Sequence, residues 1–467
     1  MELCFAGQGE FIFLAIPSPT QTANESPAAP AMAHKSALET PSVNLAAPNA
    51  LLIAYHFPPC GVSSGLQRTL CFSRDLLGLG WRPVVLTVNP RAYRETRNDQ
   101  LGQIPSEVQV KRAFALDTQR HLGVRGRYAG WMALPDPWIS WLAGALPLGL
   151  RMIQQFRPKV IWSSYPIATA HLIGFLLHRL TGVPWIADFR DPMIEIDPLT
   201  QQRFPSDSRL WTARKWVEEK TLRHCSHAVF VTPGAWGIYK ERYPNRSRDM
   251  SVIENGYDEA TFASAEMGAV SAPSASGPIT LLHSGTLYPG PDRDPTSFFA
   301  ALARLRDAKK ISADTVRVRL RATGYDPIYR EKIAQFRIED MVSLEPPLSY
   351  RDALSEMLQA DGLLLFQGAT SNPAVPAKLY EYIRARRPIF ALVDARGETA
   401  AVLNSAKVGT LVPLDSTEAI AQGLLEFLPQ VQNGIAAVAD PDVVERFSRR
   451  SRAAELARLF ERVAGAN

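Results

Sequence analysis

Short apolar runs alternate with helical patterns along most of the chain, and this alternation restricts the fold more than any other property of the sequence. The first unit begins with the run LLIAY at residues 51–55, which suits a buried parallel strand. After a turn, Leu66, Leu70 and Leu77 fall on one face of a helix, and residues 83–88 have the pattern of a second strand. Strand, turn, helix and strand in this order make a βαβ unit, which requires a parallel sheet.

The same alternation continues and then starts again in the second half of the chain. Further strands are predicted at 159–162, 184–187, 228–231, 252–253, 279–283, 316–322, 362–366 and 388–393. Helices are predicted at 168–180, 211–224, 296–307, 350–359 and 377–385. The fold class expected is α/β, with two doubly wound, Rossmann-like domains and an interdomain ligand cleft at the carboxyl ends of both sheets.

A length of 467 residues supports this division, because a single core stops growing at roughly 250–300 residues. The predicted parts are a disordered N-terminal extension (1–49), a first Rossmann-like domain (50–263), a linker (264–278), a second Rossmann-like domain (279–440) and a C-terminal helix packing across both domains (441–467). The extension and the linker are rich in small and polar residues, which bury too little apolar surface to fold alone.

Composition narrows the class of protein and its compartment. The net charge of +5 comes without a Lys/Arg block or zinc-finger spacing, so nucleic acid is not an expected partner. The four cysteines are scattered, which predicts a reducing compartment and a cytoplasmic protein. The apolar stretch 138–150 is too short to span a membrane. Trp131, Trp138 and Trp141 could instead form a peripheral membrane contact at the inner membrane face, and burial in the core explains them equally well.

Candidate site residues in the first half follow two of the predicted strands. Gly61 and Gly65 bracket the loop between the first strand and the first helix, where a backbone can approach an anionic ligand. Asp188, Arg190 and Asp191 come directly after the strand at 184–187, at the edge of the sheet where ligands bind. A loop-shaping Asp–Arg pair is the alternative for these charges, as a simple tight turn is for the glycines.

In the second half, a small-residue turn and a lysine carry the strongest signals. Gly285 and Thr286 end a strand, and Arg293 lies near the start of the following helix, an arrangement that suits a diphosphate. Lys378 falls in the first turn of a helix, where its charge opposes the helix dipole unless an anion lies between them. Glu381, one turn later, could bind ribose hydroxyls, although a Lys–Glu surface pair is the alternative.

These segments, in their order, resemble the GT-B fold glycosyltransferases of the family 4 (group 1) type used in bacterial surface polysaccharide synthesis. The resemblance covers residue 51 to the C-terminus. It is carried by six segments: YHFPP at 55–59 with its two glycines, DFRD at 188–191, TP at 232–233, ENGYD at 254–258, GT at 285–286 and PAKLYEY at 376–382.

The resemblance implies transfer of a sugar from a nucleoside diphosphate sugar to a glycan or lipid-linked acceptor, with retention at the anomeric carbon. The nucleotide sugar is then a co-substrate, and no cofactor or catalytic metal is expected. Asp188, Arg190 and Asp191 become the candidate catalytic residues on the acceptor side. Gly285, Thr286, Arg293 and Lys378 become the candidate diphosphate ligands, and Glu381 the ribose ligand.

The sequence departs from the family pattern at two positions. Pro373 stands where many members have the first of two glutamates, and Arg190 stands where many have a histidine. Two other functions therefore remain open: a catalytically inactive GT-B scaffold or binding module, and a sugar-nucleotide epimerase on the same fold. The epimerase would need acid/base groups around the sugar ring and would work without an acceptor.

Overall fold

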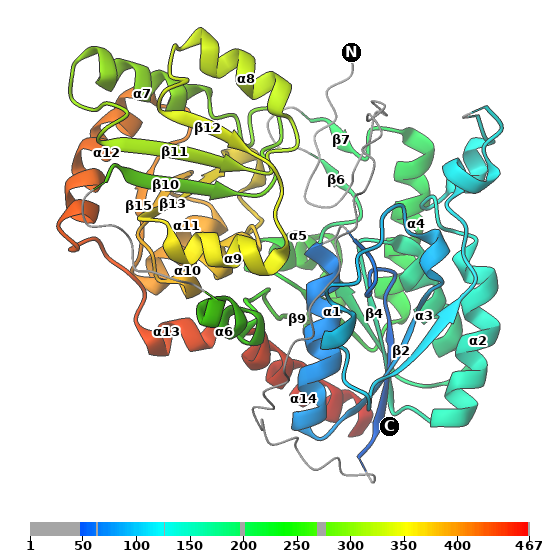
Figure 1. The fold of residues 1–467 in the computed structure, drawn as a ribbon. Coiled ribbons are helices and arrows are strands. Elements are labelled where there is room, and N and C mark those ends of the chain that lie inside the picture. Colours follow the sequence, from blue (N-terminus) through cyan, green and yellow to red (C-terminus); the bar gives the residue numbers. More distant parts are fainter. Residues whose placement is uncertain (1–46, 62–63, 126, 197–200, 269–276, 466–467) are drawn as a thin grey trace, which may run out of the picture.

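The structure, a computed structural model, describes residues 47–61, 64–125, 127–196, 201–268 and 277–465. A seven-stranded, wholly parallel sheet forms the centre of the first lobe in the order β3-β2-β1-β4-β5-β8-β9 (Figure 1). Its strands are β1 (Asn49–Ile53), β2 (Arg82–Val88), β3 (Gln109–Ala113), β4 (Val160–Ser164), β5 (Trp185–Phe189), β8 (His227–Phe230) and β9 (Met250–Val252).

A second parallel sheet, of six strands in the order β12-β11-β10-β13-β14-β15, forms the centre of the second lobe. Its strands are β10 (Ile279–Ser284), β11 (Val316–Arg321), β12 (Val342–Glu345), β13 (Gly362–Gln367), β14 (Ile389–Val393) and β15 (Thr410–Val412). The central strands β13 and β14 are buried on both faces, as their continuous apolar runs require. A small antiparallel pair, β6 (Glu195–Ile196) and β7 (Arg203–Phe204), extends from the first lobe.

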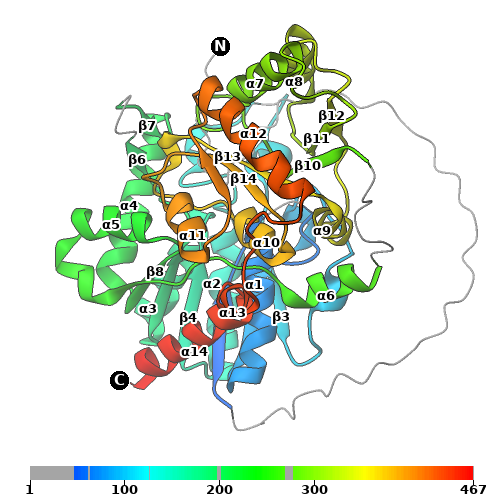
Figure 2. The same cartoon turned by 90° about the vertical axis from the view of Figure 1, so that its left-hand side faces the viewer.

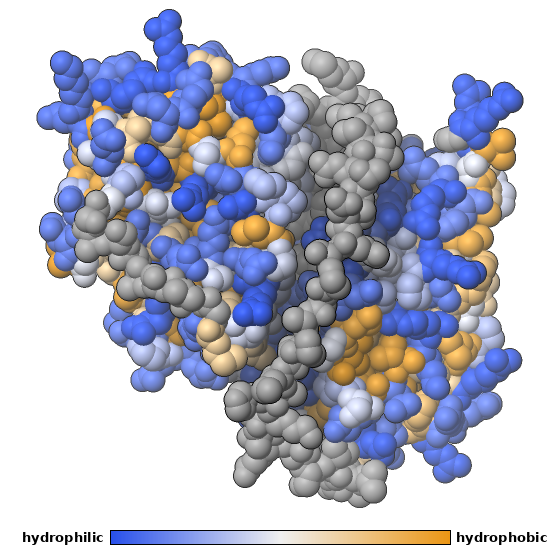
Figure 3. Space-filling model, in the orientation of Figure 1, coloured by the Kyte–Doolittle hydropathy of each residue, from blue (hydrophilic) through white to orange (hydrophobic). Residues whose placement is uncertain are grey.

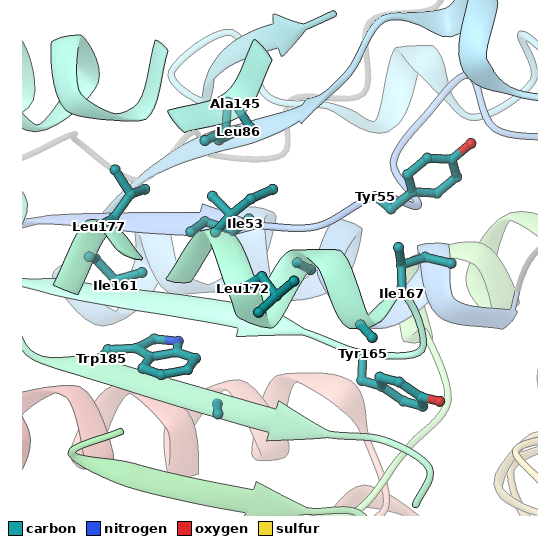
Figure 4. Packing of buried hydrophobic residues seen from close by; sticks show 14 of the residues in the cluster. Ile53, Tyr55, Leu86, Ala145, Ile161, Tyr165, Ile167, Leu172, Leu177 and Trp185 are labelled. Atoms are coloured by element: carbon teal, nitrogen blue, oxygen red, sulfur yellow. The ribbon is translucent and has the colours of Figure 1, made fainter. Parts of the chain in front are cut away.

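Helices cover both faces of the first sheet. The helices of this lobe are α1 (Ser64–Asp75), α2 (Trp141–Phe156), α3 (Ala168–Thr181), α4 (Ser208–His224) and α5 (Pro233–Arg242). On one face, side chains of α2 and α3 pack against Ile53, Leu86, Ile161 and Trp185 from four neighbouring strands (Figure 4). On the other face, α1 packs against the sheet together with the last helix of the chain.

The second sheet is covered in the same way. One face packs against α7 (Thr296–Asp307), α8 (Asp326–Gln335) and α12 (Thr417–Gln432). The other packs against α6 (Glu259–Gly268), α9 (Tyr350–Gln359), α10 (Lys378–Ala385), α11 (Glu398–Ala406) and α13 (Pro441–Arg446). Polar and charged residues dominate the surface of both lobes on the face shown in Figure 3, as expected for helices that bury a single apolar stripe.

The chain crosses between the lobes twice, and the two crossings lie side by side. Tyr257 and Ser448 form a parallel bridge, and the backbone N–H of Arg449 donates to the Tyr257 carbonyl at 2.8 Å. A Cβ on Gly256 would lie 2.5 Å from the Phe447 carbonyl oxygen, so only glycine permits this approach. Beyond the crossing, α14 (Arg449–Gly465) returns to the first lobe and packs on α1 (Figure 2).

The structure confirms the predicted fold class and corrects three details. β5 continues to Phe189, so Asp188 lies inside the strand rather than after it. The C-terminal helix is interrupted at 447–448, where the crossing segments meet. The first part of the predicted linker, 264–268, is helical because α6 runs through it. The predicted disordered extension lies outside the described residues, apart from its last three, and β1 already begins at Asn49.

Candidate functional site

The strand order of the second sheet reverses direction between β10 and β13, and open α/β sheets bind ligands at such a point. His283, near the end of β10, lies there fully buried. Its Nδ1 is 3.0 Å from the Leu364 carbonyl oxygen of β13, and its Nε2 is 3.1 Å from Nζ of Lys378. Since a carbonyl can only accept, Nδ1 carries the proton and Nε2 accepts from the lysine.

Lys378 begins α10 and has no carboxylate partner within ion-pair distance among the described residues. Burial, together with the charge of Arg293, lowers the pKa of Lys378 to about 7. Burial and the lysine in turn hold the pKa of His283 well below its usual range, so the imidazole is neutral at physiological pH. The ammonium therefore has a neutral partner and lies at a helix N-terminus, which is also positive. The arrangement favours an incoming anion.

Gly285 and Arg293 complete this cation-lined corner. Gly285 has φ of +110°, and a Cβ on it would lie 3.0 Å from Nζ of Lys378, so glycine allows the turn to approach the lysine. Arg293 is buried, lies over the ring of Tyr288 at 5.2 Å and contacts Asp292 at 3.3 Å without hydrogen-bond geometry. The partly buried Thr286 follows the turn. Of the predicted diphosphate ligands, Gly285 and Arg293 thus lie near Lys378.

Glu381 lies on the same helix and does not pair with Lys378. Its Oε1 accepts a hydrogen bond from the Tyr350 hydroxyl at 2.8 Å. Burial raises the pKa of Glu381, and the bond from Tyr350 and the nearby Arg449 oppose that shift. The surface-pair alternative for these two residues is therefore wrong.

In the first lobe, Asp188 is fully buried and fully engaged. Arg68 of α1 donates from Nε and Nη2 to its two carboxylate oxygens at 2.9 and 2.8 Å. Ser164 adds a hydrogen bond at 3.2 Å. Arg68 also donates to the carbonyls of Ile253 and Glu254, next to the crossing between the lobes. Because both oxygens of Asp188 accept from Arg68, this carboxylate holds the lobe together, and the alternative of a loop-shaping pair with Arg190 is wrong for Asp188.

Arg190 and Asp191 follow directly and have different surroundings. Arg190 is 8% exposed, and its Nε has no hydrogen-bond partner. Burial, opposed by the Arg190 charge, raises the pKa of the partly buried Asp191 to about 6. His56, after β1, lies near enough to Arg190 that burial and this charge lower its pKa to about 3. Asp191 contributes to raising the pKa of Tyr288, so this segment faces the second lobe.

The two glycines of the first loop have separate places. Gly61 packs against the 95–97 segment, and its N–H donates to the Glu95 carbonyl at 2.9 Å. A Cβ there would lie 3.0 to 3.1 Å from atoms of Glu95, which accounts for the glycine by packing alone. Gly65 is buried in the first turn of α1. Residues 62–63 between them lie outside the described part of the chain.

The structure therefore brings Gly285, Arg293, Lys378 and Glu381 together around one end of the second sheet, with Arg190 and Asp191 on the facing lobe. It sets Asp188 apart as a structural residue. Two important groups escaped the sequence reasoning. Arg68 is 120 residues from its partner and lies opposite the predicted apolar face of the first helix, so nothing in the sequence marked it as buried. His283 ended a predicted strand without any sign that it would contact a lysine.

Within the ranges that the structure describes, no group of three or more His, Cys, Asp or Glu side chains is placed to hold a metal ion. Cys71 and Cys225 are buried free thiols. None of the described helices is long and apolar enough to cross a membrane.

Comparisons with known proteins support the fold. Residues 67–256 match the model of the glycosyl transferase 4-like domain. A comparison with curated protein sequences gives no significant match.

Solved structures of the same fold cover nearly the whole chain. A sucrose-phosphate synthase from Thermosynechococcus elongatus has a TM-score of 0.64 at 14% identity, over 90% of this chain and 100% of that one. An α,α-trehalose 6-phosphate synthase from Burkholderia multivorans has a TM-score of 0.63 at 13% identity, over 90% and 98%. Anabaena Alr3699/HepE in complex with UDP-glucose has a TM-score of 0.59 at 14% identity, over 88% and 99%. The chain therefore has the GT-B fold, and its residues 67–256 match the glycosyl transferase 4-like domain.

Proposed function

We propose that the protein transfers a sugar from a nucleoside diphosphate sugar to an acceptor, with the donor held mainly by the second lobe. The observation that carries this proposal is Lys378: a largely buried ammonium at a helix N-terminus, with neutral His283 as its partner and Arg293 close by. Such a charge is costly unless an anion compensates it, and a diphosphate fits the position. Anabaena Alr3699/HepE, which shares the fold, was solved with UDP-glucose.

In this mechanism the protein acts mainly by electrostatic stabilisation. As the bond from the anomeric carbon to the diphosphate oxygen breaks, negative charge grows on the leaving group. Lys378 and Arg293 would stabilise that charge, and fixed cations in a site that excludes water are effective because they need no reorganisation. We propose that this needs no metal ion, since two cations of the chain supply the charge. Glu381, held by Tyr350, would accept hydrogen bonds from the ribose hydroxyls.

The acceptor would bind to the first lobe, near Arg190 and Asp191. A carboxyl whose pKa is about 6 can exchange a proton near neutral pH, so Asp191 suits a role beside an acceptor hydroxyl. Retention at the anomeric carbon, a glycan or lipid-linked acceptor and a place in surface polysaccharide synthesis are parts of this proposal that rest on the resemblance of the sequence motifs.

We also propose a cytoplasmic site of action with peripheral contact to a membrane, but not through the patch expected from the sequence. Trp141 is fully buried in the core of the first lobe, and Trp138 packs against that core. Trp131 differs, because it is 73% exposed and can reach a bilayer surface. A Trp131→Ser variant should then float less well with anionic liposomes than the wild type, and equal flotation would remove this contact from the proposal.

The donor site is tested by a thermal-shift screen of nucleoside diphosphates and their sugars. Saturation at 100 times the dissociation constant stabilises a protein by about 2.7 kcal/mol. We expect one nucleotide to raise the midpoint in the wild type and in the surface control Lys310→Ala, and much less in Lys378→Ala and Glu381→Ala. If no nucleotide shifts the wild type, the inactive-scaffold alternative replaces the transferase. Turnover of the nucleotide sugar to an isomer without acceptor would favour the epimerase.

A further inference from the structure

Arg190 is a buried cation whose hydrogen-bonding capacity is unused. Its Nε is enclosed without a partner, and no ion pair of this guanidinium occurs within the described ranges. Two other buried arginines differ: Arg68 binds Asp188 at 2.8 Å and Arg321 binds Glu356 at 2.6 Å. A guanidinium has several N–H donors and no acceptor, and leaving it buried and unpaired costs free energy.

The carboxylates near Arg190 do not satisfy it. Asp188 is taken by Arg68 through both of its oxygens. The negative charge of Asp191 raises the pKa of Arg190, but the two side chains form no ion pair. The positive charges of Arg68 and Arg449, by contrast, lower the pKa of Arg190. Arg449, at the start of α14, is itself buried with an unpartnered Nε. Within the described parts of the chain, Arg190 therefore has no ion-pair partner and lies near two repulsive cations.

The position of Arg190 separates it from the donor diphosphate. Arg190 comes directly after Phe189, the last residue of the first-lobe strand β5, and lies beside His56 after β1. Lys378 and Arg293 belong to the second lobe. Arg190 is not among the groups that shift the pKa of Lys378 or of His283. A ligand group that reaches Arg190 is thus a different group from the one that Lys378 receives.

We propose that Arg190 binds an anionic group, a carboxylate or a phosphate, that is separate from the donor diphosphate and is carried by the transferred sugar or by the acceptor. The proposal rests on the proposed function for the identity of the molecule that carries the group, but not for the anion site itself. Arginine suits both groups, because its planar fork can donate two parallel hydrogen bonds to a carboxylate or a phosphate. His56, kept neutral, can add a further hydrogen bond without a charge of its own.

Stability of the ligand-free protein gives the first test. Replacing an unpaired buried cation by an apolar side chain of similar length removes a cost, so Arg190→Met should melt at or above the wild-type midpoint. Arg68→Met, which leaves Asp188 buried and unpaired, should melt several degrees lower. If Arg190→Met falls as far as Arg68→Met, the guanidinium has a structural role and the proposal is overturned.

Inorganic phosphate is the probe for the site, titrated at constant ionic strength. Because phosphate can also bind at Lys378, the titration uses the Lys378→Ala background. We expect phosphate to raise the midpoint of Lys378→Ala, to have little effect on Lys378→Ala/Arg190→Met and a partial effect on Lys378→Ala/Arg190→Lys. A phosphate effect that survives in Lys378→Ala/Arg190→Met, or no effect in Lys378→Ala, overturns the proposal. Failure of the proposed function looks different, because nucleotides would then leave the midpoint unchanged whatever phosphate does.

Two matched pairs of sugars then assign the source of the anion. UDP-glucuronate against UDP-glucose tests a carboxylate on the transferred sugar. Glucose 6-phosphate against glucose, both with UDP present, tests a phosphate on the acceptor. The pair whose charged member gives an additional shift in the wild type but not in Arg190→Met identifies the carrier. An additional shift that persists in Arg190→Met for both pairs contradicts the assignment of Arg190.

Discussion

Arg68 and Lys378 are both buried cations near the carboxyl end of a sheet, one in each lobe, and they differ in what surrounds the charge. Arg68 has a bidentate carboxylate and two backbone carbonyls. Lys378 has a neutral imidazole, and Arg293 opposes its charge. The charge of Arg68 is balanced within the protein, whereas the charge of Lys378 is balanced only when an anion binds. A charge motif at a sheet edge therefore indicates a ligand site only when its counter-ion is missing.

The largest expected effect on stability comes from breaking the complete pair. Arg68→Met should lower the free energy of unfolding by about 3–5 kcal/mol, because Asp188 is left buried without a counter-ion. Urea denaturation measures it. Arg304→Met, which removes a surface pair with Glu418, should cost at most about 1 kcal/mol.

Arg68→Met combined with Asp188→Leu should recover part of the loss, since no unpaired charge remains. If the double variant is no more stable than the single one, Arg68 acts through its bonds to the Ile253 and Glu254 carbonyls instead.

Lys378, which has no counter-ion among the described residues, should matter for the rate of sugar transfer rather than for folding. Lys378→Ala should lower sugar transfer by about 10²–10³-fold, the range for removing one preorganised donor from a developing anion. Its melting midpoint without ligand should not fall. The control Lys310→Ala removes an exposed lysine of the same lobe and should leave both quantities unchanged. A Lys378→Ala protein that transfers sugar normally would remove the contrast between the two cations.

A smaller effect is expected from the group that positions Lys378. His283→Ala removes the acceptor at Nε2 and leaves the Leu364 carbonyl without its donor. Hydrogen bonds to charged groups contribute about 1.5–3 kcal/mol, so nucleoside diphosphate affinity should fall about ten- to a hundredfold. Isothermal titration calorimetry at pH 7 measures the loss. An unchanged affinity would mean that the diphosphate alone orients the lysine.

The alternation of apolar and helical patterns was enough to predict the central strands of both sheets and the place of Lys378 at a helix start, because buried strands and helix starts are coded locally. It did not predict the edge strands β3, β12 and β15. The partners of the charged residues were not predictable. Asp188 lies in a strand that continues beyond Ala187, and its burial depends on an arginine 120 residues away. The break before α14 likewise depends on Gly256 in the other crossing. Long-range contacts of this kind leave no periodic trace in one sequence.

The pH dependence of the Lys378 site should have opposite signs with and without ligand. The pKa of Lys378 is about 7 in the folded protein and has its ordinary value of 10.5 in the unfolded chain, which therefore binds more protons between these values. The contribution of Lys378 to the free energy of unfolding of the ligand-free protein is therefore lowest below pH 7, and it increases as the pH rises above 7. Ligand affinity moves the other way, since only the protonated amine compensates a diphosphate.

Between pH 7 and pH 8 the protonated fraction of Lys378 falls about fivefold, and nucleoside diphosphate affinity measured by titration calorimetry should fall by about as much. Lys378→Arg, whose guanidinium stays charged, should bind with an affinity that is nearly independent of pH over this interval. The same affinity for the wild type at both pH values would mean that Lys378 is already fully protonated, as an undetected counter-ion would require. That result would make Lys378 resemble Arg68 and would remove the main support for an anion site in the second lobe.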